Sequence, residues 1–370
     1  MFYKTRKKLS VVIAALAATC LLLVPGCGDD SPATTEALST TTVLLTTTTT
    51  VAPTTTTVAP EPVEKPLIVV TTNILGDVVS KAVGELFDVE TIMPPGADPH
   101  VFQASAKQVD RIMKADLLVV NGADFEEGLL DVIEGAESDG VKVFEAMNSV
   151  EPLEDHDEEG HDDHDEHEDH DEEGHDDHDK HEDHDEHGHD HGGVDPHFFT
   201  DPGRMAQVVN QLSDFLVLNF PEIDEEDLVS HMADYSEKLE DLDGEVMQTL
   251  SSIPESSRVL ITNHEVFAYF AESYGFEILG TIIPSPSTLS NASAKDLADL
   301  TEKMKAEGVQ AVFVDASSSD SLADALAGEV DGVEVVTLFS ESLGPEDSAG
   351  STYIDMVRTN SELIANALTG

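Results

Sequence analysis

A repetitive run of aspartate, glutamate and histidine at residues 154–193 constrains the fold more than any other feature of the sequence. Residues 156–169 read HDEEGHDDHDEHED, and residues 170–183 repeat them with one substitution. The repeats contain no apolar residue, so they can bury nothing and are not expected to fold alone. Any globular core must therefore come from the segments on either side of this run.

Histidine recurs every two to five residues in the run, which contains 12 of the chain's 16 histidines. A flexible chain can wrap several imidazoles around one cation, and imidazole suits zinc, copper and nickel. The alternative is a solvated acidic linker, which would not need histidine at this density. We predict a secondary metal-collecting loop with the ligands His156, His161, His164, His167, His170, His175, His178, His181, His184, His187, His189 and His191.

The formal net charge of the 370 residues is −58. The run contributes 22 acidic residues and one lysine, and the remainder of the chain is still strongly acidic. This charge argues against a nucleic-acid partner and suits a soluble protein that handles cations.

The N-terminus has the pattern of a bacterial lipoprotein signal. Basic residues precede an apolar stretch at 9–24, which is short for a bilayer span and ordinary for a signal peptide. The stretch ends in Val24-Pro25-Gly26-Cys27, which resembles a lipoprotein cleavage box. We predict that residues 1–26 are removed and that a lipid on Cys27 anchors the chain to the outer face of the cell membrane. An uncut membrane anchor is the alternative.

Residues 27–66 are rich in threonine, alanine and proline and are expected to form a flexible stalk. From Leu67 onwards, apolar segments typical of buried strands alternate with segments of helical spacing. Before the run, we expect strands at 67–71, 87–93, 116–121 and 141–144 and helices at 74–83, 105–114 and 125–133. After the run, we expect strands at 259–262, 276–282, 309–314 and 333–338 and helices at 204–219, 265–274, 293–306, 319–327 and 350–368.

A single long helix is predicted at 225–250, with apolar residues at steps of three and four. Its expected length of about 39 Å is enough to cross a whole domain. We therefore predict an α/β protein of two Rossmann-like lobes with mainly parallel sheets, joined by one long rigid α-helix. The expected parts are an N-terminal lobe at 67–224, a linking helix at 225–252 and a C-terminal lobe at 253–370.

The four histidines outside the run are the candidates for a defined metal site. His100 and His197 each end an Asp-Pro-His tripeptide, and His264 follows the first expected strand of the second lobe. Ligands of open α/β sheets bind at strand ends, and proline restricts the backbone before each ring. These three histidines are predicted to share one ion, whereas His231, inside the long helix among polar residues, is predicted to be solvated.

Four colinear segments resemble the zinc-type substrate-binding proteins of bacterial ABC metal importers, the cluster A-I family. They are GADPHVF at 96–102, DPHFFTDP at 195–202, VLITNHEVFAYFAESYGFEILG at 259–280 and TLFSESLGPEDSAGSTYIDMVRTN at 337–360. The resemblance covers about 67–370 and includes a His-rich insertion ahead of the second ligand.

The resemblance implies a metal site in the cleft between the lobes, with His100, His197 and His264 as ligands and Glu341 or water as the fourth. Relatives usually have aspartate where this chain has Glu341. Manganese-type relatives have a carboxylate where this chain has His264, so the resemblance implies Zn²⁺ as the bound ion. Asp315 is expected to support the site or to line its rim. An ABC permease and its ATPase are the implied partners of a monomer.

The residues alone leave three other functions open. A zinc-dependent hydrolase would use the same cleft with Glu341 or Asp315 as base, although no His-Glu-x-x-His motif, nucleophile elbow or phosphate loop is present. An importer component for manganese or another divalent metal is a second alternative. A surface metal store or adhesin, in which only the run matters, is a third. We expect a binding protein rather than an enzyme.

Overall fold

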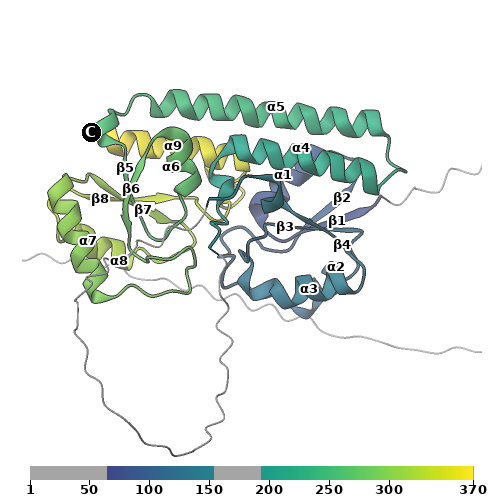
Figure 1. Ribbon diagram of the computed structural model, residues 1–370, viewed down its shortest axis with the longest axis horizontal. Helices are drawn as coiled ribbons and strands as arrows, with labels where there is room; N and C mark the ends of the chain where they lie inside the picture. The colour runs from purple at the N-terminus through teal and green to yellow at the C-terminus, as the bar shows by residue number, and fades with distance from the viewer. Residues whose placement is uncertain (1–64, 154–192, 370) are drawn as a thin grey trace, which may run out of the picture. The chain divides into compact units, whose positions relative to one another are not determined.

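The computed structural model describes residues 65–153 and 193–369. The predicted signal peptide, Cys27, nearly all of the stalk and the twelve histidines of the run lie outside the described residues. Within them, two four-stranded parallel sheets form the cores of two lobes (Figure 1). Among these residues, no helix has both the length and the apolar character that a membrane span requires.

The first sheet has the strand order β2-β1-β3-β4, and the second has the equivalent order β6-β5-β7-β8. All neighbours are parallel; for example, Leu67 pairs with Asp88 and Ala311 pairs with Glu334. The first lobe contains β1 (Leu67–Val70), α1 (Asn73–Val83), β2 (Asp88–Thr91), α2 (Ala106–Ile112), β3 (Leu117–Val120), α3 (Leu130–Ser138) and β4 (Lys142–Glu145). The second contains β5 (Val259–Thr262), α6 (Ala268–Tyr274), β6 (Glu277–Thr281), α7 (Ala294–Glu307), β7 (Ala311–Asp315), α8 (Ser321–Ala327) and β8 (Glu334–Leu338).

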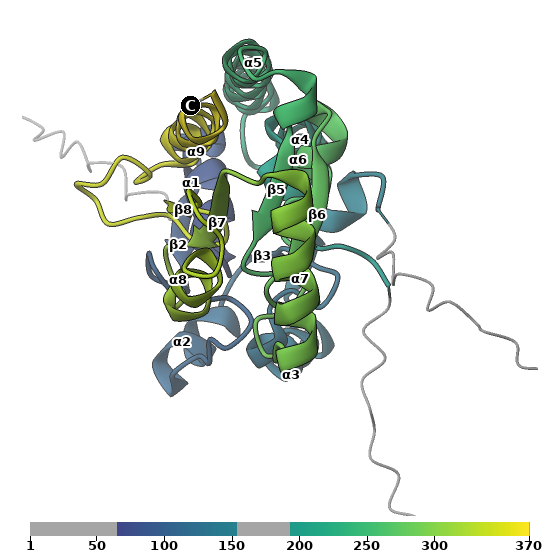
Figure 2. The ribbon, with the colours of Figure 1, turned by 90° about the vertical axis from the view of Figure 1, so that its left-hand side faces the viewer.

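Three further helices connect and cover the lobes: α4 (Pro202–Asn219), α5 (Glu225–Leu250) and α9 (Tyr353–Thr369). The 26-residue helix α5 packs on α1, α4 and α9, and Figure 2 looks along its axis. It is the linking helix that the spacing predicted. Asp224 caps its first turn by accepting a hydrogen bond from the backbone N–H of Asp227, which fixes where the helix begins.

One hydrophobic core extends through both lobes. It includes Val70 of β1, Val209 of α4, Leu239 of α5, Tyr269 of α6 and Ile364 of α9. Smaller apolar clusters lie between the second sheet and helices α7 and α8, and between the first sheet and helices α2 and α3. The shared core ties both lobes to α5.

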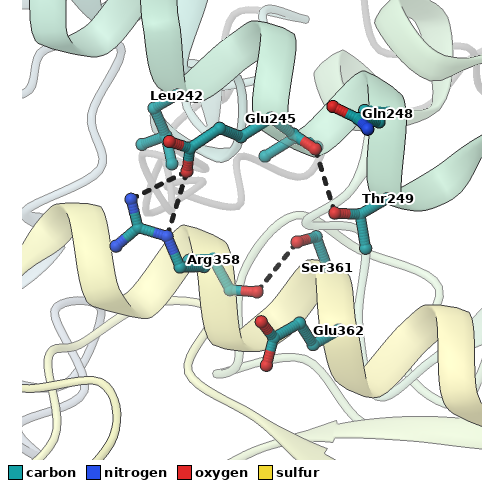
Figure 3. A pocket seen from close by; sticks show the side chains of 8 residues that line it. Leu242, Glu245, Gln248, Thr249, Arg358, Ser361 and Glu362 are labelled. Carbon is teal, nitrogen blue, oxygen red and sulfur yellow. Dashed lines mark hydrogen bonds and ion pairs between the residues drawn. The ribbon is translucent and has the colours of Figure 1, made fainter.

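An ion pair also joins α5 to α9 at the surface. Arg358 donates to Glu245 at 3.0 and 2.7 Å in a polar pocket between the two helices (Figure 3). Both side chains are exposed, so the pair contributes about 0–1 kcal/mol. Burial of the apolar face of α5 is therefore the main force that holds these helices together.

The helix expected at 125–133 starts later than predicted. After β3 the backbone turns through Gly122, Ala123 and Asp124, all with positive φ. The buried Glu126 carboxylate accepts a 2.7 Å hydrogen bond from the N–H of Asn121 and stabilises this turn. A short 3-10 turn, η1 (Glu127–Leu129), follows before α3 begins. The local turn prevents helical geometry before residue 127.

Helix α8 begins two residues later than expected, at Ser321, and helices α6 and α9 each begin three residues later. Helix α6 begins at Ala268 rather than 265, and the segment before it is held to another loop, where the N–H of Glu265 donates to the carbonyl of Ser285 at 3.1 Å. Helix α9 begins at Tyr353 rather than 350, where Asp77 accepts the N–H of Tyr353 at 3.0 Å. Both starts coincide with long-range contacts that no local pattern reports.

Candidate metal-binding site

Four buried side chains from both lobes converge on one point. The ligand atoms of His100, His197, His264 and Glu341 all lie within 4.8 Å of one another. The Nε2 atoms of His100 and His264 each lie 2.9 Å from Glu341 Oε1, and Nε2 of His197 lies 3.3 Å from it. None of the four residues is more than 3% exposed. The structure thus brings together the residues that the sequence proposed as one group.

The two Asp-Pro-His tripeptides form matching turns. The Asp98 carboxylate accepts the backbone N–H of His100 at 2.9 Å, and that of Asp195 accepts the N–H of His197 at 2.8 Å. This contact from residue i to residue i+2 is an Asx turn, which proline permits because its missing N–H is not needed. The aspartate and the proline together therefore orient each imidazole.

A carboxylate also holds the outer ring nitrogen of two of the histidines. Nδ1 of His100 lies 3.1 Å from Glu127, and Nδ1 of His197 lies 2.7 Å from Asp195. An acceptor at Nδ1 places the proton there and leaves Nε2 free to bind a metal. The geometry thus prepares the two rings as ligands for one ion.

Asp315 holds the backbone that presents Glu341. Its Oδ2 accepts hydrogen bonds from the N–H and hydroxyl of Ser340, at 2.9 and 2.6 Å, and from the N–H of Glu341 at 3.1 Å. Asp315 ends β7 and is 2% exposed, so it lies behind the site rather than on its rim. Of the two positions expected for Asp315, the geometry matches the supporting one.

The donor set fits a tetrahedral divalent cation. Three imidazoles and one carboxylate are an ordinary zinc ligand set. Oε2 of Glu341 and Nδ1 of His264 are both buried, and neither makes a hydrogen bond. A buried carboxylate oxygen without a donor is costly, and a bound cation would remove that cost.

The charges of the cluster are strongly coupled. Burial disfavours the charged form of His100, but its hydrogen bonds to Glu127 and Glu341 outweigh this and raise its pKa to about 10. Burial opposes the charge of His197 as well, and Asp195 raises the pKa of that ring. Burial alone would raise the pKa of Glu341, but the charge of His264 and the histidine hydrogen bonds hold it well below its usual value. Binding of a cation is therefore expected to release protons, because an imidazole must be neutral to ligate a metal.

We expect the metal-free protein to lose stability as the pH rises from about 6.5 to about 10. The pKa of His100 rises from 6.5 to about 10 on folding. Its proton therefore stabilises the fold fully below pH 6.5, and that contribution disappears as the pH passes through 10. Urea unfolding of metal-free protein across this interval measures the effect, and His100→Gln should reduce the slope. A free energy of unfolding that increases over the interval would contradict the assignment.

Elsewhere in the described segments, polar side chains do not form a second cluster of metal ligands. His231 is exposed on α5, as the sequence predicted, and its Nδ1 lies 2.8 Å from the carbonyl of Asp227. The pocket between α5 and α9 in Figure 3 is lined by Glu245, Arg358, Glu362 and neighbouring residues without histidine. A guanidinium within this pocket opposes cation binding, so it is not a metal candidate.

Sequence reasoning missed the carboxylates that hold the backbone or the ring of the ligand histidines. Asp98 and Asp195 carried a signal, since each stands two residues before a candidate ligand in the same tripeptide. Glu127 carried none, because 27 residues separate it from His100 and nothing in its neighbourhood marks it. Only the folded chain identifies it.

Comparison with known proteins agrees with the fold and with metal binding. The sequence family described as "ZnuA: Zinc-uptake complex component A periplasmic" matches residues 68–367. The zinc-binding protein TroA of Treponema pallidum is 26% identical over 309 residues, 82% of this chain and 89% of TroA. The manganese-binding lipoprotein MntA of Bacillus subtilis is 26% identical over 310 residues, 81% of this chain and 89% of MntA. The zinc-binding lipoprotein AdcA of Streptococcus pneumoniae is 30% identical over 296 residues, 79% of this chain and 54% of AdcA.

The solved structure of periplasmic zinc binding protein TroA from Treponema pallidum matches with a TM-score of 0.68 and 25% identity. The match covers 83% of this chain and 100% of that chain. A manganese-bound periplasmic metal binding protein from Candidatus Liberibacter asiaticus, 18% identical with a TM-score of 0.65, has the same fold.

Proposed function

Because the chain belongs to the ZnuA family of zinc-uptake complex component A proteins, we propose that it captures Zn²⁺ outside the cytoplasm and delivers it to a membrane permease whose ATPase supplies the energy. The chain is a metal-binding component of an ABC importer and not an enzyme. The observation that carries the proposal is the convergence of His100, His197, His264 and Glu341 within 4.8 Å, from both lobes. A site that both lobes share can open to release its ion when the lobes move apart.

The donor set supports zinc as the ion. Imidazole suits zinc, whereas manganese prefers carboxylate, carbonyl and water oxygens. Three nitrogen donors against one carboxylate therefore favour zinc, although the relatives include both zinc-binding and manganese-binding proteins. Four protein ligands leave no open position for a reacting water, which suits an ion that is carried rather than used in catalysis.

Membrane attachment through lipid on Cys27 is part of the proposal. Cys27 lies outside the described residues, and its support is the sequence pattern together with relatives such as MntA and AdcA, which are named as lipoproteins. A lipid at the start of a long stalk would let the metal site reach a permease in the same membrane.

The His-rich run is proposed to collect zinc near the defined site. Its flanks favour this arrangement, since the N–H of Asp195 bonds to the carbonyl of Leu153 at 3.0 Å. This hydrogen bond holds the two ends of the run side by side, two residues before His197. The run can therefore be removed and its ends joined by a short linker.

Deletion of residues 154–193, closed with a short glycine linker, is expected to leave about one tightly bound zinc per chain while the total bound metal falls. The four proposed ligands of the defined site lie outside the run, and the hydrogen bond between Leu153 and Asp195 keeps the join short. Metal analysis of dialysed protein, before and after the deletion, measures both quantities. Loss of all bound zinc would favour the alternative of a surface metal store.

Competition in the deletion variant tests whether Mn²⁺ can displace zinc from the defined site. Zinc should remain bound in an equal concentration of Mn²⁺, because both the general order of divalent-metal affinities and the nitrogen donors favour it. Displacement by Mn²⁺ under these conditions would support the manganese alternative instead.

A further inference from the structure

A loop of the second lobe touches the two carboxylates that hold His100. Ser287 donates its hydroxyl to Oε1 of Glu127 at 2.5 Å, and Thr288 donates its hydroxyl to Oδ2 of Asp98 at 2.8 Å. Glu127 and Asp98 belong to the first lobe, and the two hydroxyls follow β6 in the second. These two contacts therefore join the lobes.

Each of these carboxylates contacts His100 as well. Oε1 of Glu127, the oxygen that accepts the serine hydroxyl, lies 3.1 Å from Nδ1 of the His100 ring. Asp98 accepts the His100 backbone N–H through Oδ1 and the threonine hydroxyl through Oδ2. Both the ring and the backbone of this ligand are thus linked, through one carboxylate each, to the opposite lobe.

The loop is also tied to the ligand of its own lobe. The carbonyl of Ser285 accepts the N–H of Glu265, the residue directly after His264, at 3.1 Å. The Ser285 hydroxyl accepts the N–H of Ser287 at 3.1 Å, which braces the loop internally. A short chain of hydrogen bonds consequently runs from the second-lobe ligand to the first-lobe ligand.

We propose that Ser287 and Thr288 form a clasp that sets the rate at which the metal leaves, with Glu127 as the positioning residue of His100. This inference rests on the proposed function. While the clasp is closed, His100 keeps its orientation toward the ion and the two lobes stay together. Both hydrogen bonds of the clasp are only partly buried, so water can hydrogen-bond to the separated hydroxyls and carboxylates when the clasp opens. Opening then leaves no buried group without a partner, and it frees His100 to turn away.

The double variant S287A/T288A tests the clasp in the full chain loaded with one equivalent of zinc. We expect the dissociation rate of zinc, followed by stopped flow with a chromogenic chelator, to rise about tenfold or more, since two hydrogen bonds to carboxylates are lost. The zinc stoichiometry should stay unchanged, and the melting temperature of the metal-free protein should fall only by the small amount that two partly buried hydrogen bonds contribute. S319A/S321A is the matched control, because it removes two exposed hydroxyls of the same lobe that bond to each other.

Variants of Glu127 separate positioning from simple packing. E127A should speed zinc release by about 10–100-fold, the usual effect of losing a group that orients a metal ligand. E127Q should restore most of the slow release, because its amide oxygen can still accept from His100 and Ser287. Equal release from E127A and E127Q would overturn the positioning role.

The outcomes for the clasp and for the proposed function are distinct. If wild-type protein holds one tight zinc and S287A/T288A releases it at the wild-type rate, the clasp is wrong and zinc capture stands. If the variant that lacks residues 154–193 holds no tight zinc, the proposed function fails and the clasp fails with it.

Discussion

Replacing His264 by alanine is expected to weaken zinc binding at the defined site by more than a hundredfold. A structural four-ligand zinc site is worth about 10–16 kcal/mol, so one ligand of four contributes roughly 3 kcal/mol. His264 is the histidine that the second lobe supplies, and its Nε2 faces Glu341 at 2.9 Å. Titration with a competing chelator measures the affinity, best in the variant that lacks residues 154–193, because the run would otherwise mask the loss.

His231→Ala is the matched control, since it removes an exposed histidine from α5 by the same substitution. Its zinc affinity should equal that of the parent protein. An unchanged affinity in His264→Ala would mean that this histidine does not bind the ion, and the proposed ligand set would be wrong.

Replacing Leu239 by alanine is expected to lower the free energy of unfolding by about 2–5 kcal/mol, the range for a buried leucine whose cavity cannot close. Leu239 lies in the middle of α5, is fully buried and belongs to the core that extends through both lobes. Both lobes should therefore be destabilised in one transition. Urea unfolding of the metal-free protein, followed by circular dichroism, measures the change.

Leu218→Ala on α4 is the control for this effect, because the same substitution there affects a side chain that is 80% exposed. It should change the free energy of unfolding by less than about 0.5 kcal/mol. Similar losses for the two variants would show that helix propensity, and not the shared core, stabilises α5.

Much of the fold could be predicted from local patterns. The apolar runs at 67–71 and 259–262 became central strands β1 and β5, and the spacing along 225–250 became α5. These predictions succeeded because buried strands and one-sided helices leave a periodic record in the chain. The largest errors fell at helix starts, where a turn of positive φ through Ala123 precedes α3 and a long-range hydrogen bond joins Glu265 to Ser285 ahead of α6.

The sequence by itself determined which side chains were available to a metal: three histidines outside the run at expected strand ends, and an acid in a motif that resembles a known family. Only the tertiary structure decided which other groups orient these ligand side chains. Glu127 reaches His100, Asp315 holds the Glu341 backbone, and Ser287 crosses from the other lobe. The physical reason is distance along the chain. His100 and Glu341 are 241 residues apart, and such a contact depends on how two sheets and a shared core pack, which no local pattern records.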